Sequence, residues 1–125
     1  MVLTHGGPYG VRDYASYDQW AQTIAEQGYV VVQPNYRGSG GYGNAFVKAG
    51  RSDGFGTRMQ DDLNDVVDHL AAQGVVDAGR ACVMGWSYGG YAAARAAQRV
   101  AARWRCTIAG AGVYDLPMMP CFAAE

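Results

Sequence analysis

The sequence has no excess of charge of either sign, which argues against two classes of partner. It contains 10 lysine and arginine residues and 11 aspartate and glutamate residues, for a formal net charge of −1. This balance gives no electrostatic reason to expect binding to nucleic acid or to an anionic membrane surface. No apolar run approaches the ~20 residues of a membrane span, and no charged-then-apolar signal peptide opens the chain. We expect neither partner; the compartment stays unassigned, with the cytoplasm as the default.

Residues that bind metals are also scarce. The three cysteines (Cys82, Cys106 and Cys121) cannot all pair with one another, and none lies in a CxxC or Cys/His ligand spacing. We therefore expect no metal and no cofactor. Cys82 and Cys106 lie in apolar, strand-like runs, which favours small buried side chains over a disulfide.

Glycine, by contrast, is abundant. It accounts for 18 of the 125 residues, about twice the usual share of ~7%. Seven of these glycines lie between Gly38 and Gly56. An excess of this kind indicates backbone positions that need tight turns or a close approach to another group.

Strand and helix patterns alternate along the chain. The segments expected as strands are 2–4, 29–32, 80–84 and 105–111, and those expected as helices are 17–27, 44–49, 57–73 and 88–102. Capping boxes at Ser16/Gln19 and Thr57/Gln60 are expected to start two of the helices, and the continuous β-branched run at 29–32 indicates a strand buried on both faces. This alternation predicts an α/β fold, with a mostly parallel sheet and helices on both faces.

The most specific motif is the run from Gly85 to Gly90, which fits G-x-S-x-G and lies between a predicted strand and a predicted helix. In this context the turn is so sharp that the central serine has a strained backbone, and side chains at the flanking glycines would collide with neighbouring groups. The hydroxyl of Ser87 is then presented at the carboxyl end of the sheet, where the next helix directs its free N–H groups. We interpret Ser87 as a catalytic nucleophile.

A second motif, His5-Gly6-Gly7-Pro8, follows the first predicted strand. In enzymes with a nucleophile elbow, an HGG-type loop at this position donates a backbone N–H to the oxyanion hole, and the residue after the nucleophile donates another. The candidate oxyanion donors are therefore Gly6 or Gly7 and Tyr88.

Together with 28–43 (GYVVVQPNYRGSGGYG) and 85–91 (GWSYGGY), the HGGP motif gives the chain a clear resemblance. It resembles the catalytic domain of the prolyl oligopeptidase family of serine peptidases, in the branch of the dipeptidyl peptidases and acylaminoacyl peptidases. The resemblance implies a partial α/β-hydrolase fold and a peptide substrate. It also implies that Tyr88 forms a wall of the substrate pocket, which Val113 borders.

The resemblance also reveals missing residues. In α/β-hydrolases an acid and then a histidine follow the serine in the chain, yet no histidine follows Ser87. His5 belongs to the oxyanion loop, His69 is expected on a helix surface, and Asp115 is expected to be a loop residue. We therefore expect residues 1–125 to be a partial catalytic domain that lacks upstream strands and the part with the acid and the histidine.

Three interpretations remain open. The chain derives from a serine peptidase that acts by acyl transfer through Ser87, or from an esterase or lipase-like hydrolase that uses the same elbow, or it is a non-catalytic fragment. Without the neighbouring strands of the family's sheet, the segments 29–33 and 105–111 become long apolar edges, through which self-association is expected.

Overall fold

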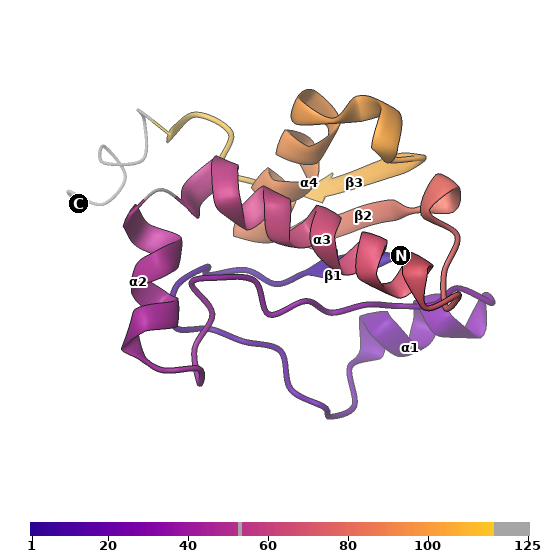
Figure 1. Ribbon diagram of the computed structural model, residues 1–125, viewed down its shortest axis with the longest axis horizontal. Helices are drawn as coiled ribbons and strands as arrows, with labels where there is room; N and C mark the ends of the chain where they lie inside the picture. Colours follow the sequence, from indigo (N-terminus) through magenta and orange to yellow (C-terminus); the bar gives the residue numbers. More distant parts are fainter. Residues whose placement is uncertain (53, 117–125) are drawn as a thin grey trace.

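The computed structural model describes residues 1–52 and 54–116, and its centre is a small parallel sheet (Figure 1). The sheet consists of three strands in chain order: β1 (Val2–Thr4), β2 (Cys82–Trp86) and β3 (Cys106–Gly110). Leu3 pairs with Met84, and Met84 pairs with Ile108. Both pairs of strands are parallel, so the parallel sheet predicted from the alternating pattern is confirmed. Parallel neighbours need crossover connections between them.

Helices occupy these connections and lie on both faces of the sheet (Figure 1). The α-helices of the described residues are α1 (Gln19–Glu26), α2 (Asn44–Ser52), α3 (Met59–Ala72) and α4 (Tyr88–Arg99). Shorter helical turns cover Gly54–Arg58, Ala78–Arg80 and Ala101–Arg103. Among the described residues, no helix is long and apolar enough to cross a membrane, and no group of three potential metal ligands occurs.

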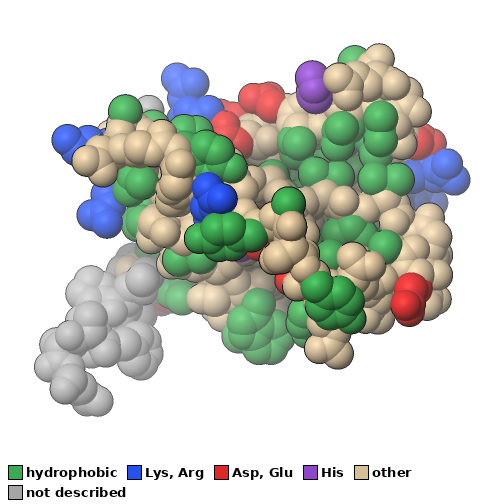
Figure 2. All heavy atoms as spheres, turned by 90° about the horizontal axis from the view of Figure 1, so that it is seen from below, with side chains coloured by type: hydrophobic (Ala, Val, Ile, Leu, Met, Phe, Trp, Pro, Cys, Tyr) green, Lys and Arg blue, Asp and Glu red, His purple; other side chains and the backbone are tan. Residues whose placement is uncertain are grey.

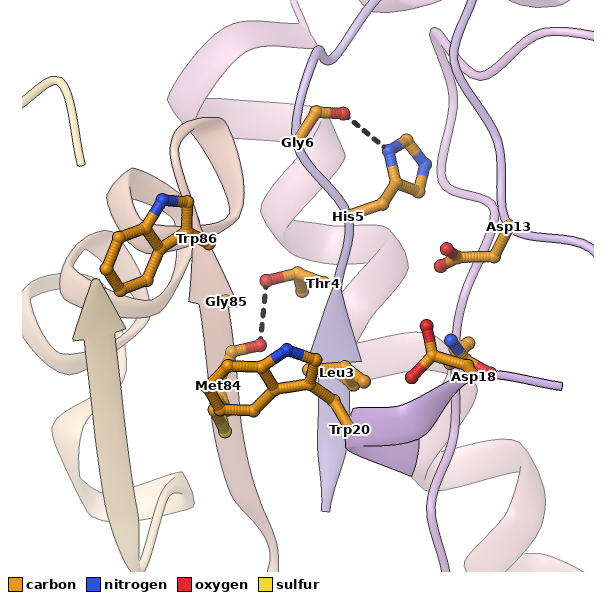
Figure 3. A pocket seen from close by; sticks show the side chains of 11 residues that line it. Leu3, Thr4, His5, Gly6, Asp13, Asp18, Trp20, Met84, Gly85 and Trp86 are labelled. Carbon is orange, nitrogen blue, oxygen red and sulfur yellow. Dashed lines mark hydrogen bonds between the residues drawn. The ribbon is translucent and has the colours of Figure 1, made fainter. Parts of the chain in front are cut away.

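The core lies between the sheet and the pair formed by α3 and α4. Val83 of β2 is completely buried, and it belongs to one cluster with Leu63 and Val67 of α3 and with Ala93 of α4. Because alternate residues of a strand point to opposite faces, Leu3 and Met84 point away from this core. There they lie beside Trp20 of α1 (Figure 3), a residue that is 58% exposed.

Both predicted capping boxes are wrong. Helix α1 begins after Asp18, whose carboxylate accepts the N–H of Ala21 at 2.7 Å, so a residue nearer the helix takes the capping role. Helix α3 follows Arg58, whose backbone is already helical (φ −63°, ψ −32°) and makes no side-chain cap. An N-cap normally needs extended backbone, which Arg58 does not have.

The β-branched run at 29–32 forms a single parallel bridge, between Val32 and Val2, and not the predicted strand. The N–H of Leu3 donates to the Val32 carbonyl at 2.8 Å, so the run lies beside β1. Tyr29 and Val30 are 55% and 46% exposed, which contradicts burial on both faces. The physical reason is that no described strand pairs with the outer edge of this run.

Cys82 and Cys106 form a disulfide across β2 and β3. The strand register makes the two residues direct partners, with their Cα atoms 4.7 Å apart. Cys82 is half-buried and Cys106 is exposed, so the prediction of two small buried thiols is wrong. Residue patterns within single strands give no information about this register.

Apolar side chains are exposed at the outer parts of the sheet. Ile108 of β3 is 47% exposed, and no strand of the described part of the chain pairs with the outer edge of β3. Figure 2, which views the molecule from the side of α1, shows further apolar groups at the surface. Tyr14 and Tyr17 are also exposed. Unpaired apolar edges favour pairing with another chain.

We predict that self-association of the chain depends on Ile108. Substituting Ile108→Lys places a charge on the β3 edge and should lower the concentration-dependent mass measured by sedimentation, because a lysine there opposes strand pairing. Val75→Lys, at a residue that is 50% exposed but outside the sheet, is the matched control and should leave association unchanged. A monomeric wild-type chain at all concentrations, or equal effects of both substitutions, contradicts the prediction.

Candidate active site

Ser87 lies at the junction of β2 and α4 in a strained conformation. Its φ of 59° and ψ of −124° place a non-glycine residue at positive φ, a region that side chains seldom adopt and that is concentrated at functional sites. The Ser87 N–H donates to the Gly110 carbonyl at 3.0 Å, and its carbonyl accepts the N–H of Tyr91 at 3.0 Å. The backbone is therefore held on both sides while the residue itself is exposed.

The glycines around Ser87 allow three chain segments to meet. A Cβ at Gly85 or at Gly89 would collide with atoms of Thr4 at the end of β1, and a Cβ at Gly90 would collide with the Gly110 carbonyl of β3. The Thr4 hydroxyl, which is buried, lies within hydrogen-bonding distance of the carbonyls of Met84 (3.0 Å) and Gly89 (3.1 Å). The expected steric requirement for glycine at positions 85 and 89 is therefore present.

Backbone groups suited to an oxyanion lie beside Ser87. The first hydrogen bond of α4 is made by the N–H of Tyr91, so the N–H of Tyr88 precedes the helical ladder and lies at the positive end of the helix dipole. A Cβ built on Gly6 would lie 3.4 Å from the Ser87 Cβ and 3.9 Å from its Oγ. Gly7, at φ 115°, lies next to Val11. The structure thus brings Gly6 and Tyr88 to Ser87, with Gly7 one residue further along the same loop.

His5 holds this loop and does not contact the nucleophile. Its ring stacks on Tyr36 with 4.3 Å between the ring centroids. Its Nε2 lies 2.9 Å from Ser39 Oγ, and its Nδ1 lies 2.7 Å from the Gly6 carbonyl oxygen. The Tyr36 hydroxyl donates to the His5 carbonyl at 2.6 Å. Sequence reasoning missed Tyr36 and Ser39, although the glycine-rich stretch that contains them was a signal.

An ion pair fastens that stretch to α3. The Arg37 guanidinium binds both carboxylate oxygens of Asp62, with its Nε 2.8 Å from Oδ2, and the Arg37 N–H donates to Oδ2 at 2.8 Å. The two parallel hydrogen bonds of a bidentate pair fix the relative orientation of the two side chains as well as strengthening their attraction. Asp62 therefore fixes the backbone between the two residues, Tyr36 and Ser39, that hold His5.

The side chain of Tyr88 is buried in the core. Its ring packs against Phe55 at 4.9 Å and Tyr36 at 5.6 Å, and its hydroxyl lies 3.3 Å from Met59 Sδ. Burial raises the pKa of Tyr88 far above its ordinary value, so the phenol stays neutral. This placement suits a backbone role for Tyr88 and gives no support to a pocket wall. Val113, half-buried beyond β3, stays a predicted pocket residue.

No general base is positioned at Ser87 within residues 1–52 and 54–116. Its Oγ makes no hydrogen bond to any of these residues, both ring nitrogens of His5 contact other groups, and His69 is exposed on α3. Asp115 is exposed beyond β3, as expected of a loop residue. The described residues thus combine the exposed Ser87 with the neighbouring backbone of Gly6 and Tyr88, and this arrangement suits acyl transfer once a base is supplied.

Sequence comparisons place these motifs in known proteins. The prolyl oligopeptidase family matches residues 15–124. Dipeptidyl aminopeptidase BIII of Pseudoxanthomonas mexicana is 44% identical over 95 residues, which cover 74% of this chain and 13% of that protein. Dipeptidyl-peptidase 5 of Porphyromonas gingivalis is 34% identical over 119 residues, covering 94% of this chain and 17% of that protein.

Solved structures agree with this result. A structure of an acylaminoacyl peptidase in complex with Z-Gly-Gly-Phe-chloromethyl ketone matches with a TM-score of 0.75 and 32% identity, covering 90% of this chain and 18% of the peptidase. The similarity confirms the predicted partial α/β-hydrolase fold. The chain spans less than a fifth of the length of each of these three proteins.

We predict that Gly89→Ala destabilises the fold, because its methyl group would collide with the Thr4 carbonyl. Overpacking of this kind costs about 1–3 kcal/mol of the free energy of unfolding, sometimes more, which chemical denaturation followed by circular dichroism measures. Gly79→Ala is the matched control, since its Cβ would meet a single side-chain oxygen at 3.3 Å. Equal stability of the two variants would contradict the packing described for the elbow.

Proposed function

The chain belongs to the prolyl oligopeptidase family, and from this membership we propose that it is the nucleophile-bearing part of a serine peptidase catalytic domain. The supporting observation is the strained Ser87 between β2 and α4, with Gly6 and the N–H of Tyr88 beside its hydroxyl. A strained serine at a glycine-lined strand-to-helix turn is typical of a nucleophile elbow.

The proposed reaction is acyl transfer from a peptide to Ser87. The Ser87 Oγ attacks the carbonyl carbon of the scissile bond while a general base takes the hydroxyl proton. The negative charge that forms on the carbonyl oxygen is bound by the N–H of Tyr88 and by a backbone N–H of the Gly6–Gly7 loop, and each donor contributes about 3 kcal/mol to transition-state stabilisation. The C–N bond then breaks and the amine leaves with a proton. Water finally hydrolyses the acyl-serine ester.

The base and its acid partner are proposed to lie in polypeptide outside these 125 residues. No histidine follows Ser87, and the relatives that share the motifs are several times longer than this chain. In this proposal residues 1–125 are a partial catalytic domain, which alone does not turn over peptides. A serine hydroxyl without a base is a weak nucleophile at neutral pH.

Short peptides are the proposed substrates. The matched relatives carry the names of dipeptidyl peptidases, and the matched acylaminoacyl peptidase is complexed with a chloromethyl ketone that carries Gly-Gly-Phe. An esterase could use the same elbow, so the proposal requires a preference for peptidyl over alkyl acyl groups.

Chemical rescue tests the role of Ser87. We expect an alkyl fluorophosphonate to label the purified chain slowly, and added imidazole to raise the rate at least ~10-fold, since a free base replaces part of the effect of a positioned one. Mass spectrometry of tryptic peptides should locate the label on Ser87, and Ser87→Ala should remove it. Ser16→Ala is the matched control at another exposed serine.

Two outcomes would overturn the proposal. If the folded chain is not labelled by the fluorophosphonate even with imidazole present, Ser87 is not a competent nucleophile. If labelling persists in the Ser87→Ala variant, another residue is the reactive one. A peptidyl diphenyl phosphonate that reacts more slowly than an alkyl one of similar leaving group would favour the esterase interpretation.

A further inference from the structure

A cavity of about 430 Å³ lies beside the oxyanion loop, on the face of the sheet away from α3 and α4 (Figure 3). Leu3 and Met84 form its apolar floor, and the indoles of Trp20 and Trp86 lie at its sides. Its volume falls within the ~300–1,000 Å³ that small-ligand sites occupy. The cavity is therefore large enough for a side chain of a ligand.

Two carboxylates converge on one wall of this cavity. Figure 3 shows Asp13 and Asp18 close together, opposite the strands. One oxygen of Asp18 accepts the Ala21 N–H at 2.7 Å. The Oδ2 atom of Asp13 is buried and has no hydrogen-bond partner among the described residues. A buried carboxylate oxygen without a partner is costly.

No basic group of residues 1–52 and 54–116 is hydrogen-bonded to Oδ2 of Asp13. The Arg12 guanidinium lies over the Tyr14 ring, 4.4 Å from its centroid, and does not line the cavity. The ring nitrogens of His5, which does line it, lie at the Gly6 carbonyl and at Ser39. Burial raises the pKa of Asp13, His5 lowers it and Asp18 raises it, in decreasing order of effect. The wall thus presents two carboxyl groups to the cavity, and Oδ2 of Asp13 has no hydrogen-bond partner among the described residues.

We propose that this cavity binds the cationic side chain of an arginine or lysine residue in a peptide substrate. The apolar stem lies on Leu3 and Met84, the charged end reaches the carboxylates of Asp13 and Asp18, and the indole faces add cation–π attraction. Gly6 borders the cavity, and a Cβ built on it would lie 3.4 Å from the Ser87 Cβ, so a peptide held there lies next to the nucleophile. The peptide as substrate rests on the proposed function; the binding site itself does not.

The test uses two peptides that differ only in charge. N-acetyl-Gly-Arg-Gly-amide and its citrulline analogue, which is neutral and of almost the same shape, are titrated into the chain while the three indole N–H signals are followed by NMR. We expect the arginine peptide to shift the signals of Trp20 and Trp86 and to leave that of Trp104, which is buried in the core, unchanged. The citrulline peptide should bind at least tenfold more weakly. Equal binding of the two peptides, or no shift with either, overturns the proposal.

Variants identify the carboxylates. Asp13→Asn should weaken binding of the arginine peptide at least tenfold and leave that of the citrulline peptide unchanged. Asp18→Asn, which keeps a capping side chain for α1, should also weaken binding of the arginine peptide. This variant replaces Asp13→Asn in the test if Asp13→Asn does not fold. Asp65→Asn, at an exposed residue of α3, is the matched control for lost charge. Unchanged affinity in a folded Asp13→Asn or Asp18→Asn variant overturns the proposal.

The same titration separates this proposal from the function of Ser87. Ser87→Ala should bind the arginine peptide with unchanged affinity, because Ser87 does not line the cavity. If Ser87 is not labelled but the arginine peptide still binds, only the peptidase proposal is contradicted. If Ser87 is labelled but the arginine peptide does not bind, only the proposed site for a cationic side chain is contradicted.

Discussion

The structure depends on the sharp turn at Ser87, where three segments approach too closely for any side chain larger than hydrogen. The end of β1 meets Gly85 and Gly89 through Thr4, and the end of β3 meets Gly90 through the Gly110 carbonyl. These approaches place the ends of the three parallel strands at one point and start α4 there. The positive φ of Ser87 follows from this geometry, since the turn leaves the serine no ordinary backbone conformation.

A second set of contacts keeps the oxyanion loop beside that turn. Asp62 of α3 binds Arg37, the neighbouring Tyr36 stacks on His5, and His5 contacts the carbonyl of Gly6. The Asp62–Arg37 and Tyr36–His5 contacts join segments that are distant in the sequence, so α3 supports the position of the loop through them. Both ring nitrogens of His5 contact groups of this loop and of the 36–39 segment, and so hold the chain in place.

The two faces of the sheet differ in how completely they are covered. On one face, the small alanines of α4 and the apolar stripe of α3 bury Val83 completely. On the other, α1 leaves the Asp13 and Asp18 cavity open beside the same oxyanion loop. The acidic wall and the turn at Ser87 are thus neighbours, since Gly6 lines the cavity and lies beside Ser87.

The sequence by itself determined the features that depend on short-range steric rules. The glycines around Ser87 and the HGG motif predicted the sharp turn and the loop beside it, because each is encoded by neighbouring residues. The tertiary structure alone decided what depends on register and on distant neighbours. The pairing of β2 with β3 brought Cys82 to Cys106, the lack of an outer neighbour exposed Tyr29 and Val30, and the packing of Phe55 and Tyr36 buried the ring of Tyr88. A residue pattern specifies which face of an element is apolar, but contacts between distant segments decide whether anything covers that face.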